Sequence, residues 1–116
     1  MRLLQSLDYS DLDFQSTLNS AINEAIVELL GAVDLWALLQ ELSTKYDVSP
    51  EELPYQIETV YRVLETKFGV VGAKTIGPIV AEKFYAKLGL AFHEHEGYVL
   101  SDYVQDAKKR TLRIHR

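Results

Sequence analysis

The sequence predicts a single all-α domain over residues 1–116: a compact orthogonal bundle of about five helices, with a short irregular or hairpin segment near residues 90–100. Apolar residues recur at steps of three and four along most of the chain, which is the spacing of amphipathic helices. A hydrophobic content of 47% and a charged content of 25% are typical of globular chains. A length of 116 residues fits one domain.

Two apolar stripes predict the first two helices. The first stripe ends at Gly31 and consists of Phe14, Leu18, Ile22, Ile26, Leu29 and Leu30. The second ends near Tyr46 and consists of Leu35, Leu38, Leu39 and Leu42, with Trp36 beside it. Because no linker separates the stripes, we expect the two helices to pack as an antiparallel pair or at a sharp angle.

A capping signal marks the start of the middle segment. Ser49 can cap a helix, Pro50 suits its first position, and Glu52 completes a capping box. We expect one short turn over residues 50–53, since Pro54 disfavours its smooth continuation. A main helix should then run from about 54 to 68 and stop at Gly69. Its predicted inner face consists of Ile57, Val60, Tyr61, Leu64 and Phe68.

The fourth helix is predicted over residues 72–88, with Gly89 as its C-cap. Its inward residues are Ile76, Val80, Phe84 and Leu88. Gly77-Pro78 lies inside it and predicts a kink or a fresh start at Pro78. Leu90 to Leu100 has no helical period, and Glu96-Gly97 indicates a tight turn that could close a minimal hairpin. A last helix should begin near Ser101 or Asp102, with Tyr103, Val104 and Ala107 on one side.

Five short segments carry a resemblance to a known family: Glu51–Pro54, Phe68–Lys74, Glu82–Leu90, Glu96–Tyr98 and Asp102–Val104. In this order and spacing they resemble the archaeal Nitrosopumilus output domain family, over roughly residues 17–110. The resemblance implies a small helical domain of unknown function, found alone or as an output module in signalling proteins. It implies no catalytic or ligand residues. Gly77-Pro78 and the histidines at 93 and 95 depart from the family pattern.

The charge is unevenly distributed along the chain. All 17 acidic residues and seven of the 12 basic ones lie within residues 1–107, which therefore carry a net charge of −10. The last nine residues hold five cations and no acid: Lys108, Lys109, Arg110, Arg113 and Arg116. This patch could attract nucleic acid, an acidic partner or the body of the protein itself, or it could merely complement a helix dipole. We expect at most weak DNA binding at about 150 mM salt.

Few catalytic or metal-binding chemistries are available to this sequence. The absence of cysteine excludes disulfides, thiolate metal sites and cysteine nucleophiles. His93 and His95 would share one side of an extended segment and could hold a metal, but a site needs three or four ligands. A solvated polar loop with adventitious metal affinity is the alternative. We expect no enzyme activity, no cofactor and no metal site.

The predicted function is therefore a non-enzymatic interaction or output module in archaeal intracellular signalling or regulation. The alternative is a nucleic-acid-associated protein that uses its basic C-terminal helix. We expect a cytoplasmic protein with no membrane contact, because no apolar run approaches the roughly 20 residues that a membrane span needs. We also expect a homodimer, because apolar residues are left over near the termini and loops: Leu3, Leu4, Leu7, Val70, Val71, Leu112 and Ile114. Tyr98, Tyr103, Leu112 and Ile114 are candidate interface residues, with core packing as the alternative role of the tyrosines.

Overall fold

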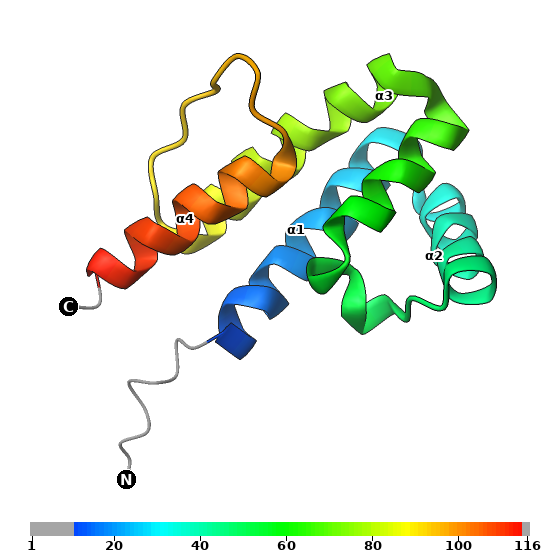
Figure 1. The fold of residues 1–116 in the computed structure, drawn as a ribbon, viewed down its shortest axis with the longest axis horizontal. Coiled ribbons are helices and arrows are strands. Elements are labelled where there is room, and N and C mark those ends of the chain that lie inside the picture. Colours follow the sequence, from blue (N-terminus) through cyan, green and yellow to red (C-terminus); the bar gives the residue numbers. More distant parts are fainter. Residues whose placement is uncertain (1–10, 115–116) are drawn as a thin grey trace, which may run out of the picture.

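The computed structural model describes residues 11–114, with side chains described for 13–111 (Figure 1). The elements are α1 (Asp11–Leu30), α2 (Ala32–Tyr46), the 3₁₀ helix η2 (Pro50–Tyr55), α3 (Ile57–Leu88) and α4 (Leu100–Ile114). No strand occurs among these residues. The predicted all-α bundle of about five helices is confirmed.

Glycines make two sharp corners, one between α1 and α2 and one inside α3. Gly31 has φ 95° and ψ 164°, and Gly69 has φ 81° and ψ 171°. Both pairs of angles fall in a region of backbone space that is open essentially only to glycine. The predicted ends of the first helix and of the main middle helix are therefore confirmed. Gly69 divides α3 into a first half, residues 57–68, and a second half, residues 70–88.

The fresh start, one of the two predicted alternatives at Pro78, does not occur. Gly69 is the only residue within α3 with non-helical backbone angles, so the helix continues through Gly77 and Pro78. Proline removes one helical hydrogen bond, and its ring normally crowds the Cβ of the preceding residue. Gly77 has no Cβ, which removes that second obstacle.

The irregular segments differ from the prediction by a few residues. The predicted capping box is present, and in it the carboxylate of Glu52 accepts a hydrogen bond of 2.8 Å from the backbone N–H of Ser49. The 3₁₀ helix that follows extends to Tyr55, so α3 begins at Ile57 rather than at 54. Residues 90–99 are irregular, with a turn closed by a 3.1 Å bond from Tyr98 N–H to the carbonyl oxygen of His95. The hairpin alternative is wrong.

The core lies where α1 packs between the two halves of α3. The fully or almost fully buried apolar residues include Phe14, Leu18, Ile22, Ile26, Leu38, Leu42, Val60, Leu64, Ile76, Val80 and Phe84. Ion pairs Lys83–Glu28 and Lys87–Glu24 join the second half of α3 to α1, and α4 packs mainly on α3. Phe68, predicted to face inward, is partly exposed because the corner at Gly69 ends the bundle there.

The two ends of the described chain lie at the same end of the molecule. Figure 1 shows the start of α1 and the finish of α4 at lower left, and the corner inside α3 at upper right. Among residues 11–114, no helix combines the length and the apolar character that a membrane span requires.

Candidate functional site

Arg110, predicted to belong to a basic interaction patch, faces inward instead. Its Nε lies 3.2 Å from Oδ2 of Asp106, and its Nη1 donates a 3.0 Å bond to the carbonyl oxygen of Ala91. Its guanidinium carbon also lies 5.7 Å from the centre of the Tyr85 ring. Arg110 therefore holds the loop of residues 89–99 against α3 and α4. Of the partners predicted for the basic residues, Arg110 therefore uses the body of the protein itself.

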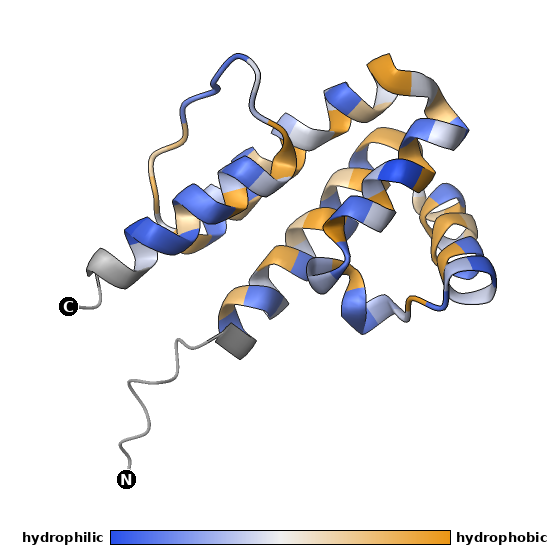
Figure 2. Ribbon diagram, in the orientation of Figure 1, coloured by the Kyte–Doolittle hydropathy of each residue, from blue (hydrophilic) through white to orange (hydrophobic). Residues whose placement is uncertain are grey.

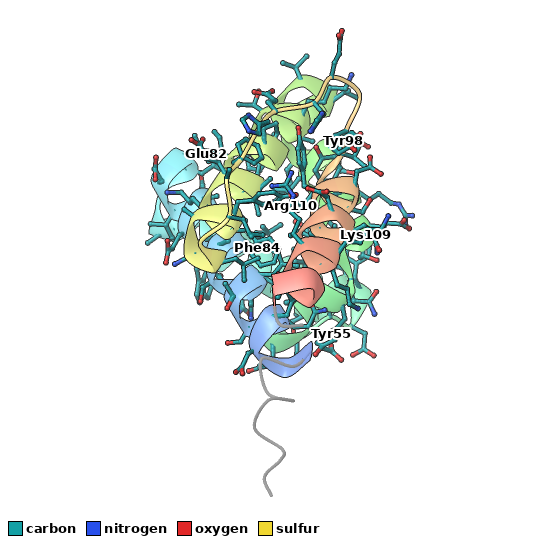
Figure 3. All side chains as sticks on the ribbon, turned by 90° about the vertical axis from the view of Figure 1, so that its left-hand side faces the viewer. Tyr55, Glu82, Phe84, Tyr98, Lys109 and Arg110 are labelled. Atoms are coloured by element: carbon teal, nitrogen blue, oxygen red, sulfur yellow. The ribbon has the colours of Figure 1, made fainter. Side chains whose placement is uncertain are left out.

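The structure describes only part of the remaining basic patch. Lys108 and Lys109 are exposed on α4, and Figure 3 shows Lys109 pointing away from the body while Arg110 points back into it. The side chains of Arg113 and Arg116 lie outside the described residues. Two exposed lysines are thus the part of the patch that the structure describes.

Tyr103, predicted as an interface residue, is buried with 2% of its surface exposed. The hydroxyl of Tyr85 lies 2.7 Å from both the Tyr103 carbonyl oxygen and Oδ2 of Asp106, and can donate to either. The Tyr103 hydroxyl accepts a 2.9 Å bond from the backbone N–H of His95. Burial, reinforced by the bond to Asp106, raises the pKa of Tyr85. Tyr103 is thus a core residue that anchors the loop, and its assignment to an interface is wrong.

The other candidate residues of the sequence prediction lie in the loop of residues 89–99 or near the end of α4. Tyr98 is exposed, and its ring lies 4.6 Å from that of His95. His93 and His95 are both exposed, and among the described residues no group of three or more histidine or acidic side chains could hold a metal ion. Leu112 and Ile114 are on α4, but their side chains lie outside the described residues, as do Leu3, Leu4 and Leu7.

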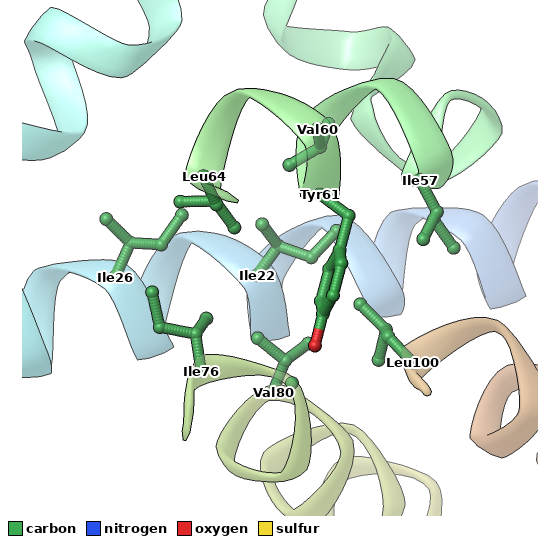
Figure 4. Close-up of a pocket in the computed structure, with 10 residues that line it drawn as sticks. Ile22, Ile26, Ile57, Val60, Tyr61, Leu64, Ile76, Val80 and Leu100 are labelled. Carbon is green, nitrogen blue, oxygen red and sulfur yellow. The ribbon is translucent and has the colours of Figure 1, made fainter. Parts of the chain in front are cut away.

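An interior void lies between α1 and the two halves of α3. Figure 4 shows the Tyr61 ring entering it beside Leu100 and Val80. The void measures about 10 Å³, which is room for one water molecule at most. An open groove of about 490 Å³ lies between α1 and η2 and is lined by polar side chains and Tyr55. Neither feature is an enclosed site for a small-molecule ligand.

The most distinctive surface is the end of the bundle that carries both glycine corners. We call it the apolar end, and it consists of Leu29, Val33, Trp36, Phe68, Val70 and Val71. The interior void described above is lined by Ile26 of α1, Leu64 of the first half of α3 and Ile76 of the second half. These three residues lie five to seven positions from the nearest glycine corner, so both corners lie toward the same end of the bundle. A 2.9 Å ion pair from Lys67 to Glu41 joins the first half of α3, close to its corner, to α2. Figure 2 shows the hydrophobic colour at the α3 corner.

The apolar end is strongly exposed and has one charge beside each corner. Val33 is 78% exposed, Trp36 64%, Val70 54% and Val71 79%. Asp34 follows the first corner and Lys74 the second, and both side chains are exposed. Neither has an ion-pair or hydrogen-bond partner within the described part of the chain. The surface therefore combines unburied apolar side chains with two unpaired charges of opposite sign.

Sequence reasoning identified only Val70 and Val71 of this surface. Val33 was not singled out, and Trp36 was placed only beside a buried stripe. A signal was present, since both corners carry the pattern glycine, small or branched apolar residue, valine. Both glycines have positive φ, and the valine two residues after each one is exposed.

No protein-family model matches this chain, and no curated protein or solved structure is significantly similar to it. The resemblance to the Nitrosopumilus output domain family therefore rests on its short motifs and stays a prediction.

Proposed function

We propose that this protein is a non-enzymatic interaction module that binds a protein partner through its apolar end. The observation that carries the proposal is the exposure of Val33, Trp36, Val70 and Val71, each more than half accessible to water. Exposed apolar surface is a common mark of a binding surface, because contact between apolar side chains and water is unfavourable in free energy.

The backbone geometry of the corners supports this assignment. Each exposed valine lies two residues after a glycine whose backbone angles few other residues can adopt. The helices behind the corners are fixed by the core, so the apolar side chains are presented in one arrangement and little ordering is needed on binding. The resemblance to the Nitrosopumilus output domain family agrees with an output module in archaeal intracellular signalling.

The experiment compares two matched valine variants of the full tagged chain. Val71→Asp places a carboxylate on the apolar end, whereas Val99→Asp alters a 47% exposed valine before α4, outside this surface. Both are used to capture proteins from a lysate of the cells of origin, followed by mass spectrometry. We expect a protein that the wild type and Val99→Asp retain and that Val71→Asp loses.

Two outcomes would contradict the proposal. A partner captured equally by both variants would show that binding uses another surface. Nucleic acid that copurifies with every variant would favour the alternative function, carried by the lysines of α4.

A further inference from the structure

The two corners of the apolar end are nearly equivalent. Gly31 and Gly69 have similar backbone conformations, with φ of 95° and 81° and ψ of 164° and 171°. Two residues after each glycine stands a valine, Val33 or Val71, with exposures of 78% and 79%. Both valines lie in the first turn of the helix that follows. Each corner therefore presents one strongly exposed valine in a similar local backbone setting.

We infer that the partner of the apolar end is a second copy of this chain, related by a two-fold axis that sets the first corner of one protomer on the second corner of the other. This inference rests on the proposed function and names its partner. A two-fold interface is self-complementary: if residue i contacts residue j, then j also contacts i. Pairing unlike corners meets that requirement, because the first corner of each protomer then contacts the second corner of the other.

The unpaired charges support the same arrangement. Asp34 stands three residues after Gly31, and Lys74 stands five residues after Gly69. Placing unlike corners together brings Asp34 of each protomer toward Lys74 of the other, which makes two ion pairs across the axis. Each charge lacks a partner within the described residues of its own chain, so the dimer breaks no existing contact to form them.

The exposed area is sufficient for a small dimer interface. An aromatic side chain can bury about 150–250 Å², and the six side chains of the apolar end together expose on the order of 600 Å² per protomer. Two copies would then bury about 1,200 Å², the lower limit for specific interfaces. We therefore expect a reversible dimer at tens of micromolar protein.

Light scattering coupled to size-exclusion chromatography tests the inference on the full chain. The wild type should have twice the 13.2 kDa chain mass at tens of micromolar. Val71→Asp should be a folded monomer, since a carboxylate is favourable in the first turn of a helix. Val99→Asp, its control, should remain dimeric.

Charge reversal tests which residues face each other. Asp34→Lys alone and Lys74→Asp alone should each give monomers, because each sets like charges together twice. The double variant should be dimeric again, and an equimolar mixture of the two single variants should form a heterodimer. Glu96→Lys, an exposed reversal in the loop of residues 89–99, should leave the dimer unchanged.

Three results would overturn the inference. They are a wild type that stays monomeric, a dimer that persists in Val71→Asp, and a double variant that remains monomeric while both single variants are folded. If the wild type is monomeric but Val71→Asp still abolishes capture of a cellular protein, the inference fails and the proposed function stands. If Val71→Asp changes neither mass nor capture, both fail.

Discussion

A close contact between the two halves of α3 gives a sharp test of the fold. A Cβ atom added at Gly77 would lie 2.8 Å from the hydroxyl oxygen of Tyr61, a separation that real Cβ atoms essentially never show. The next nearest atoms are two ring carbons of Tyr61 at 3.5 and 3.6 Å, which are ordinary contacts. The obstacle at position 77 is therefore the hydroxyl alone.

We predict that Gly77→Ala is tolerated better in a Tyr61→Phe background than in the wild type. Overpacking of this kind costs about 1–3 kcal/mol. The helix-propensity gain of alanine, about 1 kcal/mol, and the crowding of its Cβ by Pro78 are the same in both backgrounds. They cancel in a double-mutant cycle, which should leave a coupling free energy of about 1–2 kcal/mol between the two positions.

Tyr61→Phe alone should change stability little. Among the described residues the Tyr61 hydroxyl has no hydrogen-bond partner. Burial raises its pKa, as expected for a hydroxyl that is shielded from water. Replacement by phenylalanine therefore breaks no bond, and we expect a change in the free energy of unfolding within about 0.5 kcal/mol.

The assay is urea unfolding of the four proteins, followed by far-ultraviolet circular dichroism at 25 °C. Equal m-values across the set would show that only stability has changed. If Gly77→Ala has the same effect in both backgrounds to within about 0.5 kcal/mol, the Tyr61 hydroxyl does not rest on Gly77 and the reasoning fails.

Four further predictions concern the corner, the loop anchor and the charged tail. Gly69→Ala should cost about 1–3 kcal/mol of unfolding free energy in urea titrations, because alanine must adopt a glycine-only conformation; an unchanged midpoint would contradict this. Arg110→Gln should cost about 1 kcal/mol and accelerate amide exchange in residues 89–99, whereas Lys109→Gln should do neither. The pKa of Tyr85 is raised above its ordinary 10.0, so its neutral hydroxyl stabilises the fold fully below pH 10 and progressively less as pH rises beyond it. The wild type should therefore lose more stability than Tyr85→Phe between pH 8 and about pH 11, and parallel losses would refute the assignment. Fluorescence anisotropy with duplex DNA should show no submicromolar binding at about 150 mM salt; tight binding would instead favour the nucleic-acid function.

Local sequence patterns predicted the helices well, because a helix is formed by residues that lie three and four positions apart in the chain. The three- and four-residue spacing from Phe14 to Ile26 located the buried face of α1, and Gly31 and Gly69 ended helices as expected. The fresh start allowed for at Pro78 does not occur, although proline removes a helical hydrogen bond. Here the residue before it determines the result, since Gly77 gives the ring space.

The candidate site was harder to predict because it depends on distant residues. Arg110 looked like a free surface cation, but it bonds to Ala91 in the preceding loop and lies over Tyr85 on α3. Tyr103 was a candidate interface residue, but the loop of residues 89–99 covers it in the structure. The apolar end appears only when the corners at Gly31 and Gly69, which are far apart in sequence, come to one end of the bundle. No periodicity within a single helix contains that information.

The placement of the chain ends has a consequence for how this domain could be used. Asp11 and Ile114 both lie at the end of the molecule away from the glycine corners, and the longest dimension is 43 Å. Anything fused or tethered at either terminus would leave the apolar end clear. Two copies joined there would hold such cargo on opposite sides of the pair, on the order of 80 Å apart by simple end-to-end addition. The domain would then act as a spacer that couples two attached bodies while preventing them from touching each other.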